Sequence, residues 1–93
     1  MTEISNISSV RSLVQIAKHK QILDVVLSPG SRNAPFILSF SSINAFSCTS
    51  VLDERSAGFI ALGMAQQKRK PVMLSCTSGS AMINYAPAMV EAF

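Results

Sequence analysis

The chain has 93 residues, 48% of them hydrophobic and 14% charged, with a net charge of +3. This balance excludes a disordered chain and leaves room for one small globular domain. The basic residues are mostly scattered, so no nucleic-acid partner is indicated, and the longest apolar run, residues 57–65, is far shorter than the ~20 residues that span a bilayer.

The N-terminus and the few metal-ligating side chains also narrow the function classes. No apolar stretch of the signal-peptide type follows Glu3, so we expect a cytoplasmic location. Cys48 and Cys76 lie in apolar contexts without metal-ligand spacing and are expected to be reduced core residues. His19 stands alone and is expected at the surface, so no metal site is predicted within this chain.

The first predicted elements are a helix, a short buried strand and a second helix. Ser8 or Ser9 is expected to cap a helix whose apolar residues recur at helical spacing as far as about Lys20. Residues 22–27 are β-branched and apolar enough for a buried strand. A Pro-Gly turn follows, and a helix of about ten residues is expected to begin near Pro35.

The second half repeats the alternation of strand and helix. Residues 46–52 predict a strand, Asp53 begins a helix that runs to about Gln67, and residues 72–76 predict a third strand. The Lys68-Arg69-Lys70 run is expected to be a solvated helix end. A last helix runs toward the end of the chain, and Pro87 is expected to kink or break it.

This order of elements predicts an α/β fold. Strands that alternate with helices of this length form right-handed βαβ units and a parallel sheet flanked by helices on both faces. A domain of this type usually needs about 150 residues, so we expect the chain to be the incomplete N-terminal portion of one. The carboxyl ends of parallel strands share one edge, where ligands of open α/β sheets bind. The turns at 28–32, 53–54 and 77–80 should therefore meet there.

The first of these turns has the composition of an anion site. Ser31 and Arg32 lie just before a predicted helix, whose unpaired N–H groups and dipole favour a carboxylate or phosphate. The alternative is a capped helix with an exposed arginine. Two interpretations also apply to Ser78 and Gly79, which lie before the last helix. They either cap the helix in the ordinary way or contact a ligand.

The helix that follows Asp53 has an unusual composition. Asp53 is expected to be its N-cap, which puts Glu54 in the first turn. Beyond that turn the helix is apolar on nearly every face, so we expect it to be buried and packed closely on more than one side. Gly58 and Gly63 suggest close approach to a subunit partner or to the sheet. Partial desolvation would favour the protonated form of Glu54 and suit it to proton exchange; the alternative is a solvated carboxylate.

The combination of motifs resembles the N-terminal part of the MenD family, the 2-succinyl-5-enolpyruvyl-6-hydroxy-3-cyclohexene-1-carboxylate synthases of menaquinone biosynthesis. The resemblance spans residues 22–93, with the motifs in consistent order and spacing. They are SPGSR at 28–32, DER at 53–55 with Gly58 behind it, TSGSA at 77–81, YAPA at 85–88 and EA at 91–92.

The resemblance implies a thiamine-diphosphate-binding fold and a role for several residues. Residues 1–93 would be the N-terminal part of the aminopyrimidine-binding domain, truncated. Glu54 matches the catalytic glutamate that contacts N1′ of the cofactor and exchanges a proton with it. Ser31 and Arg32 match substrate-contacting positions, where the arginine would bind a carboxylate. Ser78 and Gly79 match the loop near the pyrimidine.

The implied activity is that of a transferase which decarboxylates 2-oxoglutarate and adds the succinyl unit to isochorismate. The chain lacks the Gly-Asp-Gly and Asn pattern that holds magnesium and diphosphate in the second cofactor domain of these enzymes. That domain comes from another subunit, so the resemblance implies a homodimer or homotetramer with a shared site, and we expect the 93 residues alone to be inactive. The alternatives are an acetolactate-synthase relative and a non-catalytic α/β anion-binding domain.

Overall fold

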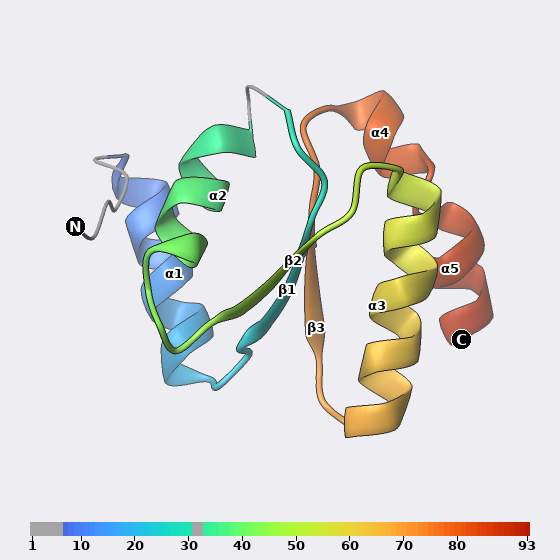
Figure 1. The fold of residues 1–93 in the computed structure, drawn as a ribbon, viewed down its shortest axis with the longest axis horizontal. Helices are drawn as coiled ribbons and strands as arrows, with labels where there is room; N and C mark the ends of the chain where they lie inside the picture. Colours follow the sequence, from blue (N-terminus) through green and yellow to red (C-terminus); the bar gives the residue numbers. More distant parts are fainter. Residues whose placement is uncertain (1–6, 31–32) are drawn as a thin grey trace.

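The computed structural model describes residues 7–30 and 33–93, which form a parallel sheet between two layers of helices (Figure 1). The elements in chain order are α1 (Ser8–His19), β1 (Asp24–Leu27), α2 (Ala34–Ser41), β2 (Ser47–Ser50), α3 (Glu54–Lys68), β3 (Val72–Ser75), α4 (Gly79–Ile83) and α5 (Ala86–Ala92). The α/β class predicted from the sequence is confirmed.

The sheet has the order β2-β1-β3, and β1 pairs in parallel with both neighbours. In register, Asp24 lies beside Ser47 and Val72, and Leu27 lies beside Ser50 and Ser75. The three strands therefore end at the same level. All four residues of β1 are buried, whereas those of β3 are only half-buried. The central strand is the most buried because helices cover both of its faces and a strand lies along each of its edges.

Alternation along β1 divides the core into two clusters. Val25 and Leu27 face α1 and α2, where they pack with Val14 and Phe40. Val26 faces the opposite way, toward α3 and α5. There it packs with the remaining buried members of that cluster, Ala57, Ala61 and Tyr85. Successive strand residues point to opposite faces, so three consecutive apolar residues anchor both helical layers.

Two local expectations are wrong in detail. Neither Ser8 nor Ser9 caps α1, since Ile7 is the N-cap residue and makes no side-chain capping bond. The strands are also shorter than the apolar runs that predicted them. Leu23 and Phe46 pack in the core beside the ladder without being strand residues. Apolar composition reports burial, and burial extends beyond the residues that pair in the sheet.

The break expected from Pro87 is confirmed. The last helix divides into α4 and α5, with Asn84 and Tyr85 between them and Pro87 in the first turn of α5. Proline fits a first turn because its missing N–H would have no helical partner there. The division turns Tyr85 inward, where only 6% of the residue is exposed.

Within the described residues helix α3 is buried on one face, and the expected close packing on a further side, for which a subunit partner was one candidate, stays a prediction. Ala57, Gly58 and Ala61 are buried, whereas Phe59 and Ile60 are 42% and 43% exposed. The two glycines of α3 differ in the space around them. A Cβ on Gly58 would lie 3.0 Å from Ala88 Cβ, because α3 and α5 approach closely there. A Cβ on Gly63 would meet nothing within 4 Å.

The two glycines form a matched pair of tests. Gly63→Ala should raise the free energy of unfolding by up to about 1 kcal/mol, because alanine is the better helix former. Gly58→Ala should instead lower it by about 1 kcal/mol, because the short Ala88 side chain cannot swing aside and α5 must move. Urea unfolding followed by circular dichroism measures both. Equal stabilisation by the two substitutions would contradict the close approach of α3 and α5.

Candidate functional site

The turns that follow β1 and β3 meet at the carboxyl edge of the sheet, as the sequence predicts. The Ser28 N–H donates to the Ser75 carbonyl at 2.8 Å, which extends the pairing of the two strands into the turns. Gly30 then packs directly against Thr77. A Cβ on Gly30 would lie within 2.7 Å of Thr77 Cγ2 and Oγ1, so only glycine allows this approach.

Asn33 joins both turns from within and is a residue that sequence reasoning missed. It is 1% exposed, its Nδ2 donates to the Ser28 carbonyl at 2.8 Å, and its Oδ1 accepts from the Ser75 hydroxyl. An amide both donates and accepts, so one side chain satisfies two polar groups at the ends of neighbouring strands. The available signal was an asparagine directly before a helix, which reads as an ordinary cap.

Glu54 begins α3 at the same edge of the sheet. Asp53 caps the helix, as predicted, and its Oδ2 accepts from the Ser56 N–H at 2.9 Å and the Ser56 hydroxyl at 2.8 Å. These bonds lower the pKa of the Asp53 carboxyl. Asp53 is thereby occupied in capping, whereas Glu54 is half-buried in the first helical turn. Glu54 is the carboxylate left to meet a ligand here.

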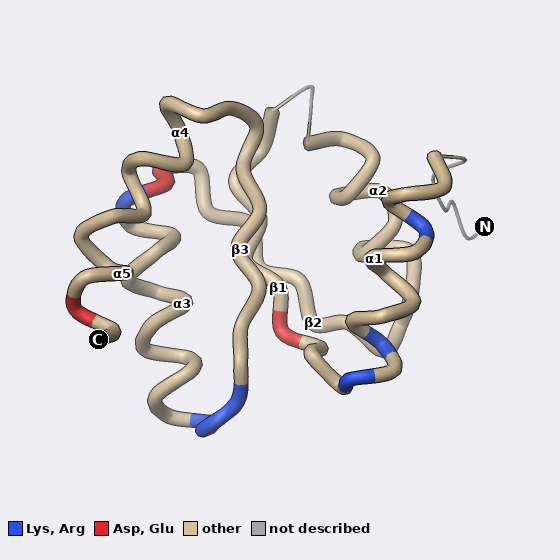
Figure 2. Tube along the Cα trace, turned by 180° about the vertical axis from the view of Figure 1, so that it is seen from behind, with Lys and Arg blue, Asp and Glu red and all other residues tan. Residues whose placement is uncertain are grey.

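Most basic residues lie at the end of the sheet away from the start of α3, although both ends of the molecule carry acidic and basic residues (Figure 2). The acidic start of α3 lies beside α4 at the carboxyl edge, while the basic ends of α1 and α3 lie at the other end of the sheet. The basic run is not simply solvated, as the sequence suggested, because Lys68 Nζ pairs with Asp24 Oδ1 at 2.8 Å. That ion pair ties the end of α3 to the start of β1, away from Glu54.

Tyr85 places a buried hydroxyl beside the ends of β1 and β3. The Tyr85 OH and the Ser28 Oγ are both buried and have no hydrogen-bond partner among the described residues. Burial raises the pKa of Tyr85 to about 12; the Ser28 hydroxyl lowers it, and Cys76 and the charge of Glu54 raise it further. Ser28 thus lies near enough to influence the phenol without reaching hydrogen-bond geometry. The phenol stays protonated at neutral pH and can act as a donor.

The remaining predicted site residues have different outcomes. Ser31 and Arg32 lie outside the described residues. Ser78 is the N-cap of α4, where its Oγ accepts from the Ala81 N–H at 3.4 Å. Gly79 is exposed, and a Cβ there would meet nothing within 4 Å. The capping role of Ser78 is confirmed, while a cofactor contact from Ser78 or Gly79 stays a prediction.

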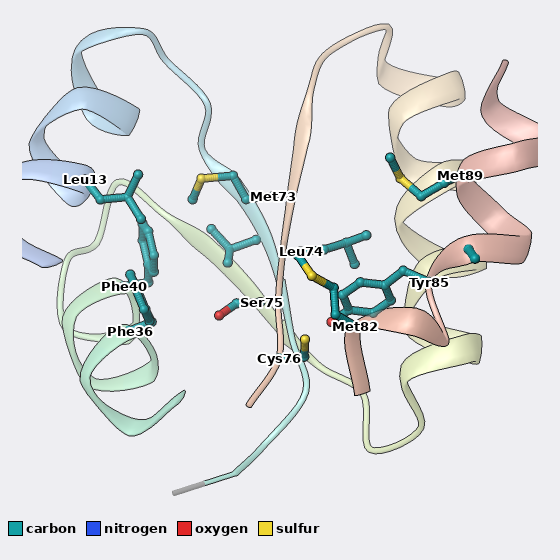
Figure 3. Close-up of a pocket in the computed structure, with 12 residues that line it drawn as sticks. Leu13, Phe36, Phe40, Met73, Leu74, Ser75, Cys76, Met82, Tyr85 and Met89 are labelled. Carbon is teal, nitrogen blue, oxygen red and sulfur yellow. The ribbon is translucent and has the colours of Figure 1, made fainter. Parts of the chain in front are cut away.

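A cavity of about 640 Å³ lies around β3, between the two helical layers (Figure 3). Phe36 and Phe40 line one side, and Tyr85 and Met89 line the other. Within the described residues the outer edge of β3 has no strand partner, which leaves this space open. Its walls are almost entirely apolar, and the polar groups are confined to the carboxyl end of β3 at Ser75, Cys76 and the Tyr85 hydroxyl.

Residues 7–30 and 33–93 contain no group of three or more His, Cys, Asp or Glu side chains placed to hold a metal ion. None of the helices among them is both long and apolar enough to cross a membrane. Cys48 and Cys76 are free and half-buried, and burial raises the pKa of the Cys48 thiol.

The role of Asn33 can be tested by substitution. Asn33→Ala should lower the free energy of unfolding by about 2 to 3 kcal/mol, because it leaves two polar groups at the strand ends without their partner. Asn44→Ala, at an exposed asparagine, is the control and should change stability by less than about 0.5 kcal/mol. The measurement is urea unfolding of both variants. Matching midpoints for the two would show that the bonds of Asn33 contribute nothing.

Known proteins match nearly the whole chain. Residues 8–93 match the family described as "Thiamine pyrophosphate enzyme, N-terminal TPP binding domain". Proteins named 2-succinyl-5-enolpyruvyl-6-hydroxy-3-cyclohexene-1-carboxylate synthase are similar to it in sequence. The one from Flavobacterium psychrophilum is 53% identical over 83 residues, and the one from Porphyromonas gingivalis is 50% identical over 92 residues.

These matches cover 89% and 99% of this chain but only 15% and 16% of the two relatives. The chain therefore corresponds to a small part of those synthases. The parallel sheet, the glutamate at the head of α3 and the glycine-containing turns all lie within the matched residues. The chain belongs to the thiamine pyrophosphate enzymes, as an N-terminal TPP binding domain of the kind found in MenD synthases.

Proposed function

We propose that this chain is the N-terminal part of the aminopyrimidine-binding domain of a synthase dependent on thiamine diphosphate. The whole protein would be a transferase that decarboxylates 2-oxoglutarate and adds the succinyl unit to isochorismate. The observation that carries the proposal is the position of Glu54, at the head of α3 and at the carboxyl edge of a parallel sheet. The names of its relatives, which match 89–99% of the chain, support the reaction.

The groups at this edge fit an aminopyrimidine, which has nitrogen atoms that donate and accept hydrogen bonds on a flat apolar ring. Glu54 supplies a half-buried carboxyl group, and its neighbour Asp53 is already occupied in capping. The buried hydroxyls of Ser28 and Tyr85 are unpartnered among the described residues, so polar capacity remains at the site. When bound, the cofactor would supply a carbon nucleophile for attack on a 2-oxo acid.

Each candidate site residue has a proposed task in this reaction. Glu54 holds a proton at the N1′ position of the pyrimidine and exchanges it, which glutamine cannot do. Arg32 binds a substrate carboxylate through charge-assisted bonds, and Ser31 orients the same group. Ser78 and Gly79 lie along the pyrimidine, where the absence of a side chain at Gly79 leaves space for the ring.

Other parts of the protein would complete the site. We expect the groups that hold magnesium and diphosphate to come from a domain outside these 93 residues, contributed by a second subunit of a homodimer or homotetramer in the cytoplasm. The 93 residues alone should then form no product. Both proposed substrates carry carboxylates, which calls for a cation such as Arg32 to bind them.

The role of Glu54 is tested by Glu54→Gln in the full-length protein. Exchange of the cofactor C2 proton for deuterium should become at least about 100-fold slower, since general acid–base catalysis contributes 10²–10⁴-fold. Quenched-flow proton NMR measures the exchange. Glu91→Gln, an exposed glutamate on α5, is the control and should exchange at the normal rate. Exchange at the normal rate in Glu54→Gln would overturn the proposal.

The role of Arg32 is tested by the choice of 2-oxo acid. Arg32→Ala should raise the KM for a carboxylate substrate by about 10- to 100-fold, the range expected for loss of a charged hydrogen bond. Steady-state kinetics with 2-oxoglutarate, isochorismate and pyruvate measures the effect, with Arg11→Ala, an exposed arginine on α1, as the control. Normal KM values in Arg32→Ala, together with a preference for pyruvate, would favour an acetolactate-synthase relative instead.

A further inference from the structure

The unexplained polar groups of this structure gather in one place behind Glu54. Ser28 directly follows β1, Cys76 directly follows β3, and Tyr85 is the N-cap residue of α5. Ser28 is 0% and Tyr85 is 6% exposed, and their hydroxyls have no partner within residues 7–30 and 33–93. A buried hydroxyl without a partner costs about 1–3 kcal/mol, so this arrangement needs an explanation.

The ring of Tyr85 is fixed against the first turns of α3. Its Cδ1 lies 3.6 Å from the position that a Cβ on Gly58 would take, and its Cα lies 3.7 Å from the same point. Gly58 follows Glu54 by one helical turn, so the two positions lie on the same side of the helix. The glycine lets α5 come close, so that the ring of Tyr85 packs against α3 one helical turn after Glu54.

The charged and titratable groups around the phenol limit what it can bond to. Glu54 and Cys76 act on it electrostatically, and Arg55, beside Glu54, is exposed. The pKa of Tyr85, about 12, keeps the phenol protonated and therefore a donor. Cys76 is a weak acceptor, so the Glu54 carboxylate is the strongest acceptor in this group. Hydrogen bonds of this kind are often long before a ligand binds and shorten in the complex.

We propose that Tyr85 is a positioning residue for Glu54, its buried hydroxyl donating to the Glu54 carboxyl group when the cofactor is bound, with Ser28 lining the same polar pocket. This proposal rests on the proposed function of Glu54. It explains the cost of the unpaired phenol: the hydroxyl has no partner within residues 7–30 and 33–93, and the cofactor complex would give it one in the Glu54 carboxyl group.

The test is a double-mutant cycle in the full-length protein, with thiamine diphosphate and Mg²⁺ as the probe. Tyr85→Phe keeps the ring on Gly58 and removes only the hydroxyl. It should leave the melting temperature without cofactor unchanged or higher, because an unpaired buried group is removed. It should weaken cofactor binding by roughly tenfold, as expected for a bond to a charged group. Isothermal titration calorimetry and thermal unfolding measure the two effects.

The cycle separates a positioning role from a structural one. In the Glu54→Gln background, Tyr85→Phe should weaken cofactor binding by less than about twofold, because its effect passes through the carboxylate. The same tenfold loss in both backgrounds, or no loss in either, would overturn this proposal alone. Exchange of the cofactor C2 proton at the normal rate in Glu54→Gln would instead overturn the proposed function.

A second variant keeps the proposal testable if Tyr85→Phe unfolds. The full-length protein with 3-fluorotyrosine at position 85 retains the hydroxyl, and its ¹⁹F resonance reports the surroundings of the phenol. Cofactor binding should shift this resonance, and Glu54→Gln should abolish most of the shift. The same shift with and without the Glu54 carboxylate would show that the two side chains do not meet.

Discussion

The structure depends on the position of β1 at the centre of a parallel sheet. Its apolar residues point alternately to the two helical layers, so both clusters of the core depend on this one strand. Because β2 and β3 pair with it in parallel and in register, the three strands end at one level. The turns that follow must then share an edge, whatever their separation in the sequence. The candidate site is a consequence of this topology.

Some polar groups at that edge have hydrogen-bond partners among the described residues, and others have none. Asn33 satisfies the Ser28 carbonyl and the Ser75 hydroxyl, so the backbone of the two turns is held firmly. The Ser28 and Tyr85 hydroxyls remain unpaired in the described chain. A fold gains stability when every buried polar group has a partner, and departures from that rule are typical of functional sites. Asn33 thus satisfies one pair of polar groups at the edge, while the Ser28 and Tyr85 hydroxyls keep their bonding capacity within the described residues.

Helix α3 shows how one element serves both packing and the site. Its buried face is made of small residues, Ala57, Gly58 and Ala61, which let β1 and α5 come close. That closeness brings Tyr85 against Gly58, one helical turn after Glu54, whose charge influences the phenol. The opposite face carries Phe59 and Ile60, which nothing in residues 7–30 and 33–93 covers. The small residues on the buried face of α3 therefore allow Tyr85 to pack near the helix turn that carries Glu54.

The sequence by itself determined the order of elements, the parallel sheet, the shared edge and the cap at Asp53, because these follow from local periodicity, turn chemistry and the handedness of βαβ units. Its motifs also indicated Glu54. It did not reveal Asn33 or Tyr85, whose roles depend on contacts with residues more than 25 positions away or on a helix break that turns a ring inward. It also could not decide which face of α3 packs against the sheet and α5, because apolar residues all round a helix show only that it can be buried, and the packing of its neighbours selects the face.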